Sequence, residues 1–365
     1  MTTLIVPAAG ESSRYGLSRP KYLLQHPLGL SMLSHSILGL LSPKRLHIER
    51  IVVVVRLEHF EEISLELLKQ ELTELENFAG VVEILPLDFS TRSMVETISL
   101  AIERMDIKGS IIVKDCDNFV TPASTKIDWS GENWVCFANL QEFPAVSAQN
   151  KAYLDISNRG YVIGAFEKRI SSPTISVGTI HFSSASAFMQ IASELLQEQE
   201  TYVSDIVELM IRAGEVFRAV EVESYSDWGT LSDWLEYVST FGTVFVDLDG
   251  VMAQNNNPLS KEHGWNELSF LPRNKETLLR LLKSGRVSLV FCTSRSEKHR
   301  ESVERGLRDA GFPVEQLIMG LPHAKRILVN DFARTNPFPS AIAINLQRDD
   351  DNLSPYLPPR LGELL

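Results

Sequence analysis

Short apolar runs alternate with amphipathic patterns along two long stretches of this chain, and no other feature constrains its fold as strongly. In the first stretch, strands are predicted at 3–6, 51–55, 81–85 and 110–114, with helices at 31–41 and 63–75. In the second, strands are predicted at 243–246, 287–291 and 326–329, with helices at 275–283 and 297–309. Such alternation is typical of βαβ units around a mostly parallel sheet. We therefore expect two Rossmann-like three-layer α/β domains, at 1–239 and 240–365.

The two helices of the second stretch carry recognisable end signals. Asn274 is placed to cap the first of them, because its side-chain oxygen can accept from a free backbone N–H of the first turn. Gly285 and Gly311 directly follow the two helices, at the position where a glycine in the left-handed conformation ends a helix.

The composition excludes several classes of partner. The chain has 365 residues, of which 44% are hydrophobic and 22% charged, as is typical of globular domains with substantial cores. A formal net charge of −12 argues against nucleic acids and anionic membranes as partners, because both need a basic protein surface. The three cysteines are widely spaced, and no apolar run reaches the roughly 20 residues of a membrane span. We expect a cytoplasmic protein.

The strand predicted at 3–6 ends in a loop that suits phosphate. Ala9, Gly10 and the serines after them let backbone N–H groups approach phosphate oxygens closely. Arg14 and Lys21 follow and supply positive charge. A turn without any ligand can have the same small residues, so the loop alone leaves both interpretations open.

The order Ala8-Ala9-Gly10, Arg14 and Pro20-Lys21 resembles the signature of nucleotidyltransferases that activate sugar phosphates and related alcohol phosphates. The resemblance implies a GT-A-like fold for 1–239, with a nucleoside triphosphate and a phosphorylated sugar or alcohol as substrates. It implies that Lys21 holds the α-phosphate or the acceptor phosphate and that Arg14 holds the departing pyrophosphate. Nucleotide contacts are implied for Ala9, Gly10, Ser12 and Ser13. Ser12 departs from the family pattern, in which many members have a second glycine.

Two carboxylates follow another predicted strand. Asp115 and Asp117 come directly after the apolar run 111–113, at the end of the strand where open α/β sheets bind their ligands. Carboxylates together with phosphate oxygens are a usual site for Mg²⁺, the cofactor that we expect. A structural turn with Asn118 has the same pattern.

The family resemblance extends further along the chain. Asp227, in Asp227-Trp228-Gly229-Thr230, resembles the family's second metal ligand. Glu167, Lys168 and Gly178 resemble the elements that contact the acceptor, although a surface ion pair and a strand bulge would look the same. The segment 93–97 lacks the glycine with which the family usually reads the base, which leaves the nucleobase open.

The strand predicted at 243–246 ends in Asp247-Leu248-Asp249-Gly250, which resembles the first motif of the haloacid-dehalogenase-like (HAD) phosphatases. The resemblance implies a capless HAD-like fold in which Asp247 forms an aspartyl phosphate, Asp249 protonates the leaving alcohol, and both bind Mg²⁺. The later motifs of the family match Thr293 and Arg295, implied to bind the phosphoryl group and substrate, and Asp331, implied as a further metal ligand. Lys325 is the nearest candidate for the lysine that neutralises the phosphate.

Together the resemblances imply a bifunctional enzyme. One domain would transfer a nucleotidyl group to a sugar or alcohol phosphate, and the other would hydrolyse a phosphate monoester, in the synthesis of glycoconjugate or capsular polysaccharide precursors. Two alternatives stay open. The first is a GT-A glycosyltransferase that uses Asp115-Cys116-Asp117 as its metal motif, and the second is a nucleotidyltransferase with a non-catalytic HAD-like binding module. A homo-oligomer is compatible with each of these.

Overall fold

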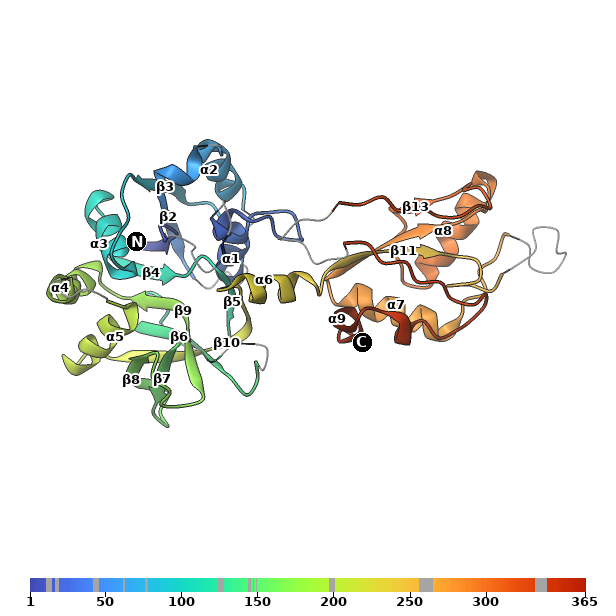
Figure 1. Cartoon of the computed structure of the whole chain (residues 1–365). Coiled ribbons are helices and arrows are strands. Elements are labelled where there is room, and N and C mark those ends of the chain that lie inside the picture. The colour runs from blue at the N-terminus through green and yellow to red at the C-terminus, as the bar shows by residue number, and fades with distance from the viewer. Residues whose placement is uncertain are drawn as a thin grey trace. The chain divides into compact units, whose positions relative to one another are not determined.

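The computed structural model describes residues 1–10, 15–16, 20–41, 46–61, 63–75, 78–123, 128–143, 146, 148, 150–196, 201–255, 265–331 and 340–365. The contacts within the chain divide it into two compact units, Met1–Trp234 and Leu235–Leu365 (Figure 1). The division lies within helix α6 (Leu231–Val238), shortly before the boundary expected at 239.

The first unit is built on one large sheet. The described residues form ten strands in the order β3-β2-β1-β4-β9-β6-β10-β8-β7, with β5 paired to β10. The strands are β1 (Thr2–Pro7), β2 (Ile48–Arg56), β3 (Val81–Leu87), β4 (Ser110–Lys114), β5 (Asn118–Pro122), β6 (Asn133–Asn139), β7 (Ala152–Ile156), β8 (Tyr161–Glu167), β9 (Thr174–Phe182) and β10 (Phe217–Asp227).

The sheet is mixed, so the prediction of a mostly parallel sheet holds only for its first half. Strands β1 to β4 are parallel, because a helix carries the chain back across the sheet after each of the first three. Beyond β4, strand β9 is antiparallel to both β4 and β6, and β10 is antiparallel to β5 and β8. Strands β7 and β8 are separated by only four residues, 157–160, which is too short for a helical crossover and makes the pair an antiparallel hairpin.

Helices cover both faces of this sheet, as the three-layer prediction required. They are α1 (Met32–Leu41), α2 (Leu65–Thr73), α3 (Met94–Arg104), α4 (Ala185–Leu195) and α5 (Val203–Arg212). Leu4 and Val6 of β1 share a core with side chains of α1 and α2, whereas Ile5 shares a core with α3, α4 and α5. Since successive side chains of a strand point to opposite faces, a strand that is apolar throughout is buried on both sides.

The second unit has a small parallel sheet in its described residues. Its strands are β11 (Gly242–Asp247), β12 (Val287–Cys292) and β13 (Leu317–Ile318), in that order. Its helices are α7 (Pro272–Lys283), α8 (Arg300–Asp309) and the single turn α9 (Pro359–Gly362). Leu278 of α7, Leu307 of α8 and Phe291 of β12 are fully buried in its core. Gly285 and Gly311 have φ angles of +69° and +91°, which confirms their predicted place after α7 and α8.

Two predictions for this unit are wrong. Residues 326–329 form no strand, and Ile327 and Val329 are 82% and 94% exposed. Among the described residues no strand pairs with this short apolar triplet to satisfy its backbone. Asn274 does not cap α7, because the helix already begins at Pro272, whose fixed φ suits a first helical position. The buried Asn274 amide instead donates to the carbonyls of Val251 and Asp350, at 2.7 and 2.8 Å.

Within the described ranges, no helix is both long and apolar enough to cross a membrane.

Candidate active site

A cavity of about 420 Å³ opens at the carboxyl ends of β1, β4 and β10. This is the edge of an open α/β sheet where ligands bind, because the loops that follow neighbouring parallel strands converge there. Most of the residues predicted to act in the first unit line it. They include Gly10, Lys21, Asp115, Asp117, Glu167, Gly178 and Asp227.

Asp115 sits against the backbone of β9. Its N–H donates to the carbonyl of Gly178 over 2.8 Å, and a Cβ built on Gly178 would lie 1.8 Å from its Oδ2. Gly178 also has a φ of +65°, which L-residues with side chains rarely adopt. Only glycine fits here, so the residue predicted as an acceptor contact makes room for a carboxylate. Burial, and then the neighbouring charge of Asp117, raises the pKa of Asp115 above its usual range.

Lys21 connects two acidic segments of the site. It begins a short 3₁₀ turn, Lys21–Leu23, and its ammonium forms an ion pair with Asp117. The same nitrogen lies 3.5 Å from the carbonyl of Gly229, two residues after Asp227. The side chains of the pair are only 11% and 16% exposed, so their charges interact in a poorly screened environment.

A second lysine, which the sequence analysis missed, belongs to this site. Lys151 lies directly before β7, lines the cavity and forms an ion pair with Asp227. The other oxygen of Asp227 accepts from the N–H of Gly229 over 3.3 Å. Burial raises the pKa of Asp227, and Lys151 opposes that shift. No motif surrounds Lys151, so only the fold, which joins positions 151 and 227, reveals its role.

Tyr15 holds the segment around Asp227 in place and was also missed. Its hydroxyl donates to the carbonyl of Trp228, and its ring is buried, with the ammonium of Lys21 5.6 Å from the ring centroid. Burial raises the pKa of Tyr15 well above its usual value, so the hydroxyl stays protonated and can donate. A tyrosine next to a glycine-rich loop is the one signal that could have drawn attention to it.

Glu167 and Lys168 contact the start of α5 and the residue before it. Glu167 accepts from the hydroxyl of Ser204 over 2.9 Å and lines the cavity. Lys168 reaches the hydroxyl of Tyr202 at 2.5 Å and lies 4.6 Å from the centroid of its ring. Both side chains therefore tie the end of β8 to the wall of the cavity.

The loop after β1 is described only in part. Gly10 is exposed and lines the cavity, whereas Ala9 is buried in the core beneath the sheet. Ser12, Ser13 and Arg14 lie outside the described residues.

The carboxylates fit a magnesium ion that arrives with phosphate. Among the described residues no group of three or more His, Cys, Asp or Glu side chains is close enough to enclose a metal. Mg²⁺ needs no such cage, because it is commonly held by one or two carboxylates, with phosphate oxygens and water completing its shell. The cradle that Gly178 leaves for Asp115, and the exposure of Asp115 and Asp227 to the same cavity, suit that arrangement.

The second unit brings some of its predicted residues together. Arg295 is fully buried and donates to both oxygens of Asp249, from Nε at 3.1 Å and from a terminal nitrogen at 2.7 Å. The hydroxyl of Thr293 donates to Asp249 as well, over 3.0 Å. An Asp249 oxygen that is to act on a leaving alcohol must therefore share or give up one of these contacts.

The surroundings of Asp247 and of the residues predicted beyond β13 differ from those of Asp249. Desolvation raises the pKa of Asp247, and the nearby Arg326 opposes this shift. Lys325 and Asp331 are exposed in an irregular segment. Arg326, the residue next to the predicted Lys325, lowers the pKa of Asp247 more than His323 does, and both act in the same direction.

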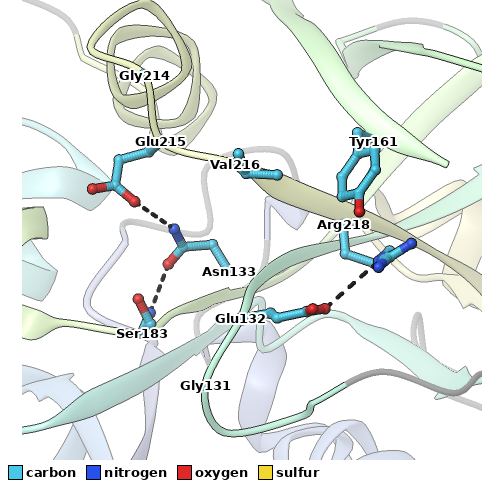
Figure 2. A pocket seen from close by; sticks show the side chains of 9 residues that line it. All are labelled: Gly131, Glu132, Asn133, Tyr161, Ser183, Gly214, Glu215, Val216 and Arg218. Carbon is cyan, nitrogen blue, oxygen red and sulfur yellow. Dashed lines mark hydrogen bonds and ion pairs between the residues drawn. The ribbon is translucent and has the colours of Figure 1, made fainter. Parts of the chain in front are cut away.

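A second cavity, of about 350 Å³, lies in the first unit (Figure 2). Asn133 spans it, with its Nδ2 3.2 Å from Glu215 and its Oδ1 2.7 Å from the N–H of Ser183. Arg218 lies over the ring of Tyr161 and 3.6 Å from Glu132. These residues surround the start of β10, whereas Asp227 ends it, so roughly 30 Å of strand separates this cavity from the carboxylates.

Comparisons with known proteins show a likeness of fold over about two thirds of the chain. No family model matches the chain, and no curated protein matches it in sequence. The crystal structure of a nucleoside-diphosphate-sugar pyrophosphorylase from Vibrio cholerae RC9 is similar, with a TM-score of 0.53 at 20% identity, over 64% of this chain and 98% of that one. An inositol-1-phosphate CTP transferase from T. maritima matches with a TM-score of 0.49 at 12% identity, over 63% and 90%. The first of these likenesses shows that the two proteins share a mixed α/β fold.

Proposed function

We propose that the first unit transfers a nucleotidyl group from a nucleoside triphosphate to a sugar phosphate or related alcohol phosphate and releases pyrophosphate. The observation that carries this proposal is the meeting of Lys21, Asp115 and Asp227 in one cavity at the ligand-binding edge of the sheet. The fold shared with a nucleoside-diphosphate-sugar pyrophosphorylase supports it.

In the proposed reaction, an oxygen of the acceptor phosphate attacks the α-phosphorus of the triphosphate. The bond from the α-phosphorus to the bridging oxygen breaks, that oxygen leaves with pyrophosphate, and no covalent enzyme intermediate forms. Bound Mg²⁺, held by Asp115 and Asp227 with Asp117 beside them, would neutralise phosphate charge. Catalysis of this kind depends on positioning and on charges placed in advance.

The two lysines of the cavity suit this reaction. Each forms an ion pair with a carboxylate of the site, Lys21 with Asp117 and Lys151 with Asp227. When a polyphosphate enters, each ammonium can pass to a phosphate oxygen without leaving the cavity. We assign Lys21 to the α-phosphate or acceptor phosphate, and Lys151 to the phosphate group nearest Asp227.

The remaining residues complete the proposed site. Glu167 faces the cavity and, with Lys168, would contact the acceptor. The loop of Gly10, Ser12 and Ser13 would bind the nucleotide, and Arg14 would bind the departing pyrophosphate.

For the second unit we propose hydrolysis of a phosphate monoester, with Asp247 as nucleophile and Asp249, Thr293 and Asp331 around the phosphate and its Mg²⁺. Arg326 supports this assignment, because a cation whose field reaches Asp247 can also attract a phosphate. Together the two activities would serve the synthesis of glycoconjugate or capsular polysaccharide precursors in the cytoplasm.

A matrix of substrates tests the first activity. The four common nucleoside triphosphates are each combined with a panel of sugar phosphates and alcohol phosphates, and pyrophosphate release is measured with Mg²⁺. We expect release that requires both substrates, that is lost in Asp227→Asn and that persists in Asp106→Asn, which changes a surface aspartate paired only with an exposed lysine. Sugar transfer from a nucleotide sugar, without any pyrophosphate from triphosphates, would instead identify a glycosyltransferase.

A further inference from the structure

Lys114, a buried lysine that does not line the cavity, has a further role in this site. Lys114 is the last residue of β4 and directly precedes Asp115. Its side chain is 0% exposed, although lysine is almost never fully buried without a partner of opposite charge. Among the described residues no carboxylate oxygen lies within 4 Å of its ammonium.

The contacts of Lys114 all go to the turn that carries the carboxylates. Its Nζ donates to the carbonyl of Asp115 over 2.7 Å, to the carbonyl of Asn118 over 3.0 Å, and to the side-chain oxygen of Asn118. The three donors of the ammonium thus have three acceptors, which span the turn from residue 115 to residue 118.

Asn118 extends this network to the strand that supports Asp115. Its amide donates to the carbonyl of Val177 over 3.0 Å, next to Gly178, whose carbonyl accepts from the N–H of Asp115. Lys114 therefore holds one side of the turn while β9 holds the other, and Asp115 and Asp117 project from the fixed segment between them.

An apolar or amide side chain would fill this position at lower cost if only packing mattered, because burying an ammonium in protein is strongly unfavourable. The ammonium interacts electrostatically with both Asp115 and Asp117, two carboxylates separated by one residue, so its charge can offset their mutual repulsion. A positive charge beneath the turn offsets part of that repulsion, including when no metal is bound.

We infer that Lys114 is a positioning residue that acts as a built-in counter-ion, keeping the Asp115-Cys116-Asp117 turn assembled before Mg²⁺ and the triphosphate arrive. This inference rests on the proposed function, since it takes the turn to be the magnesium site of a nucleotidyltransferase. It predicts that Mg²⁺ can partly replace the lysine, because both supply positive charge to the same two carboxylates.

The test compares the thermal stability of full-length variants with and without saturating Mg²⁺. Lys114→Met removes the charge and its hydrogen bonds, Lys114→Gln removes the charge but keeps hydrogen-bond donors, and Lys108→Met is the control at an exposed lysine. Without metal, both Lys114 variants should have a lower Tm than the wild type. Added Mg²⁺ should raise the Tm of the two Lys114 variants by more than it raises that of the wild type or of Lys108→Met. The Lys114 variants should also bind Mg²⁺ on the order of tenfold more tightly than the wild type does.

The same measurement can also overturn the role inferred for Lys114. A lysine that only holds the turn through its hydrogen bonds predicts a loss of Tm that Mg²⁺ does not restore. If Mg²⁺ raises the Tm of a folded Lys114 variant no more than it raises that of the wild type, the inference is overturned. Pyrophosphate release by the wild type is measured in parallel. Its absence would defeat the proposed function, whereas the Mg²⁺ comparison would still decide the role of Lys114.

Discussion

Single charges decide what this cavity can bind. Asp115, Asp117, Asp227 and Glu167 face it, against only two lysines among its described lining residues. Such a surface repels a polyphosphate unless divalent metal accompanies it and the lysines are well placed. Each lysine is consequently expected to matter far more than a surface lysine would.

Replacement of Lys21 by methionine tests this directly. Lys21→Met keeps the length of the side chain but removes the charge that bridges Asp117 and the carbonyl of Gly229. We expect pyrophosphate release to fall by about 100-fold or more, as for other groups that stabilise transition-state charge. Steady-state assays at saturating Mg²⁺ measure the effect, with Lys108→Met as the control; unchanged kcat in Lys21→Met would contradict the role assigned here.

Gly178 is a second position at which a single added atom should change the stability and activity of the protein. In Gly178→Ala the new Cβ would overlap the carboxylate of Asp115, and the backbone would remain in a strained conformation. We expect a loss of about 2–4 kcal/mol in the free energy of unfolding, of which about 1 kcal/mol comes from the strained backbone and the rest from the overlap, together with loss of activity. Gly160→Ala is the matched control, with a φ of +77° and nothing within 4 Å, and should lose only about 1 kcal/mol. Equal losses in urea unfolding of the two variants would show that contact with Asp115 contributes nothing.

The predicted site residues differ in how far sequence could reach them. Local sequence patterns point to Asp115, Asp117 and Lys21, because each of them follows a recognisable strand or loop. The structure brings these three residues into one cavity with Asp227. Lys114 and Lys151 gain their roles only from partners, and the partner of Lys151 lies 76 residues away. No local pattern encodes such a pairing, because it is set by the register of strands that meet only in the folded sheet.

Among the elements, β9 does the most to organise the first unit. It inserts antiparallel between β4 and β6, supports Asp115 through Gly178, and carries the fully buried His181. The ring of His181 stacks on Trp134, with its Nδ1 2.7 Å from the carbonyl of Glu132. Its Nε2 has no hydrogen-bond partner among the described residues, so protonation there would bury an unsatisfied charge.

This geometry predicts how the stability of the first unit depends on pH. Burial lowers the pKa of His181 from 6.5 to about 4, so between those values the unfolded chain binds a proton that the folded chain does not. The stability that depends on a neutral His181 is therefore fully present above pH 6.5 and is lost as the pH falls toward 4. The loss from this residue should be on the order of 3 kcal/mol.

Urea unfolding at several pH values, followed by tryptophan fluorescence, measures this dependence. In His181→Gln the slope between pH 6.5 and 4 should be shallower than in the wild type, with a remaining part from His35, whose pKa burial also lowers to about 4. His47→Gln, at an exposed histidine, should leave the slope unchanged. An identical slope in His181→Gln would show that His181 does not cause the acid sensitivity.

Elements were predictable where a largely buried apolar strand is followed by a helix, as for β1 and β2, and β4 was predictable from its continuous apolar run. The antiparallel insertion of β9 was not, since the direction of a strand depends on the connection that reaches it and not on its own residues. The apolar triplet 327–329 shows the converse case: its pattern suits a strand, but its side chains lie exposed in irregular backbone.

The whole chain combines two compact units with separate hydrophobic cores. Since the proposed sites lie wholly within one unit each, their activities should be separable by mutation. We expect Asp247→Asn to stop release of phosphate from monoesters while leaving pyrophosphate formation intact, and Asp115→Asn to do the reverse. Parallel assays of both products in each variant measure this, and simultaneous loss of both activities in either variant would count against independent sites.

We propose that this chain makes a nucleotide-activated phosphate compound, and following the α-phosphorus through the reaction tests this proposal. A triphosphate labelled at the α-phosphorus is incubated with the wild-type protein, Mg²⁺ and the acceptor phosphate, and the products are separated. The label should appear in a product that also contains the acceptor, with unlabelled pyrophosphate formed in equal amount, and Lys21→Met should slow the formation of both by about 100-fold or more. Label that stays in the triphosphate, or that passes only into the free nucleoside monophosphate, would contradict nucleotidyl transfer to the acceptor.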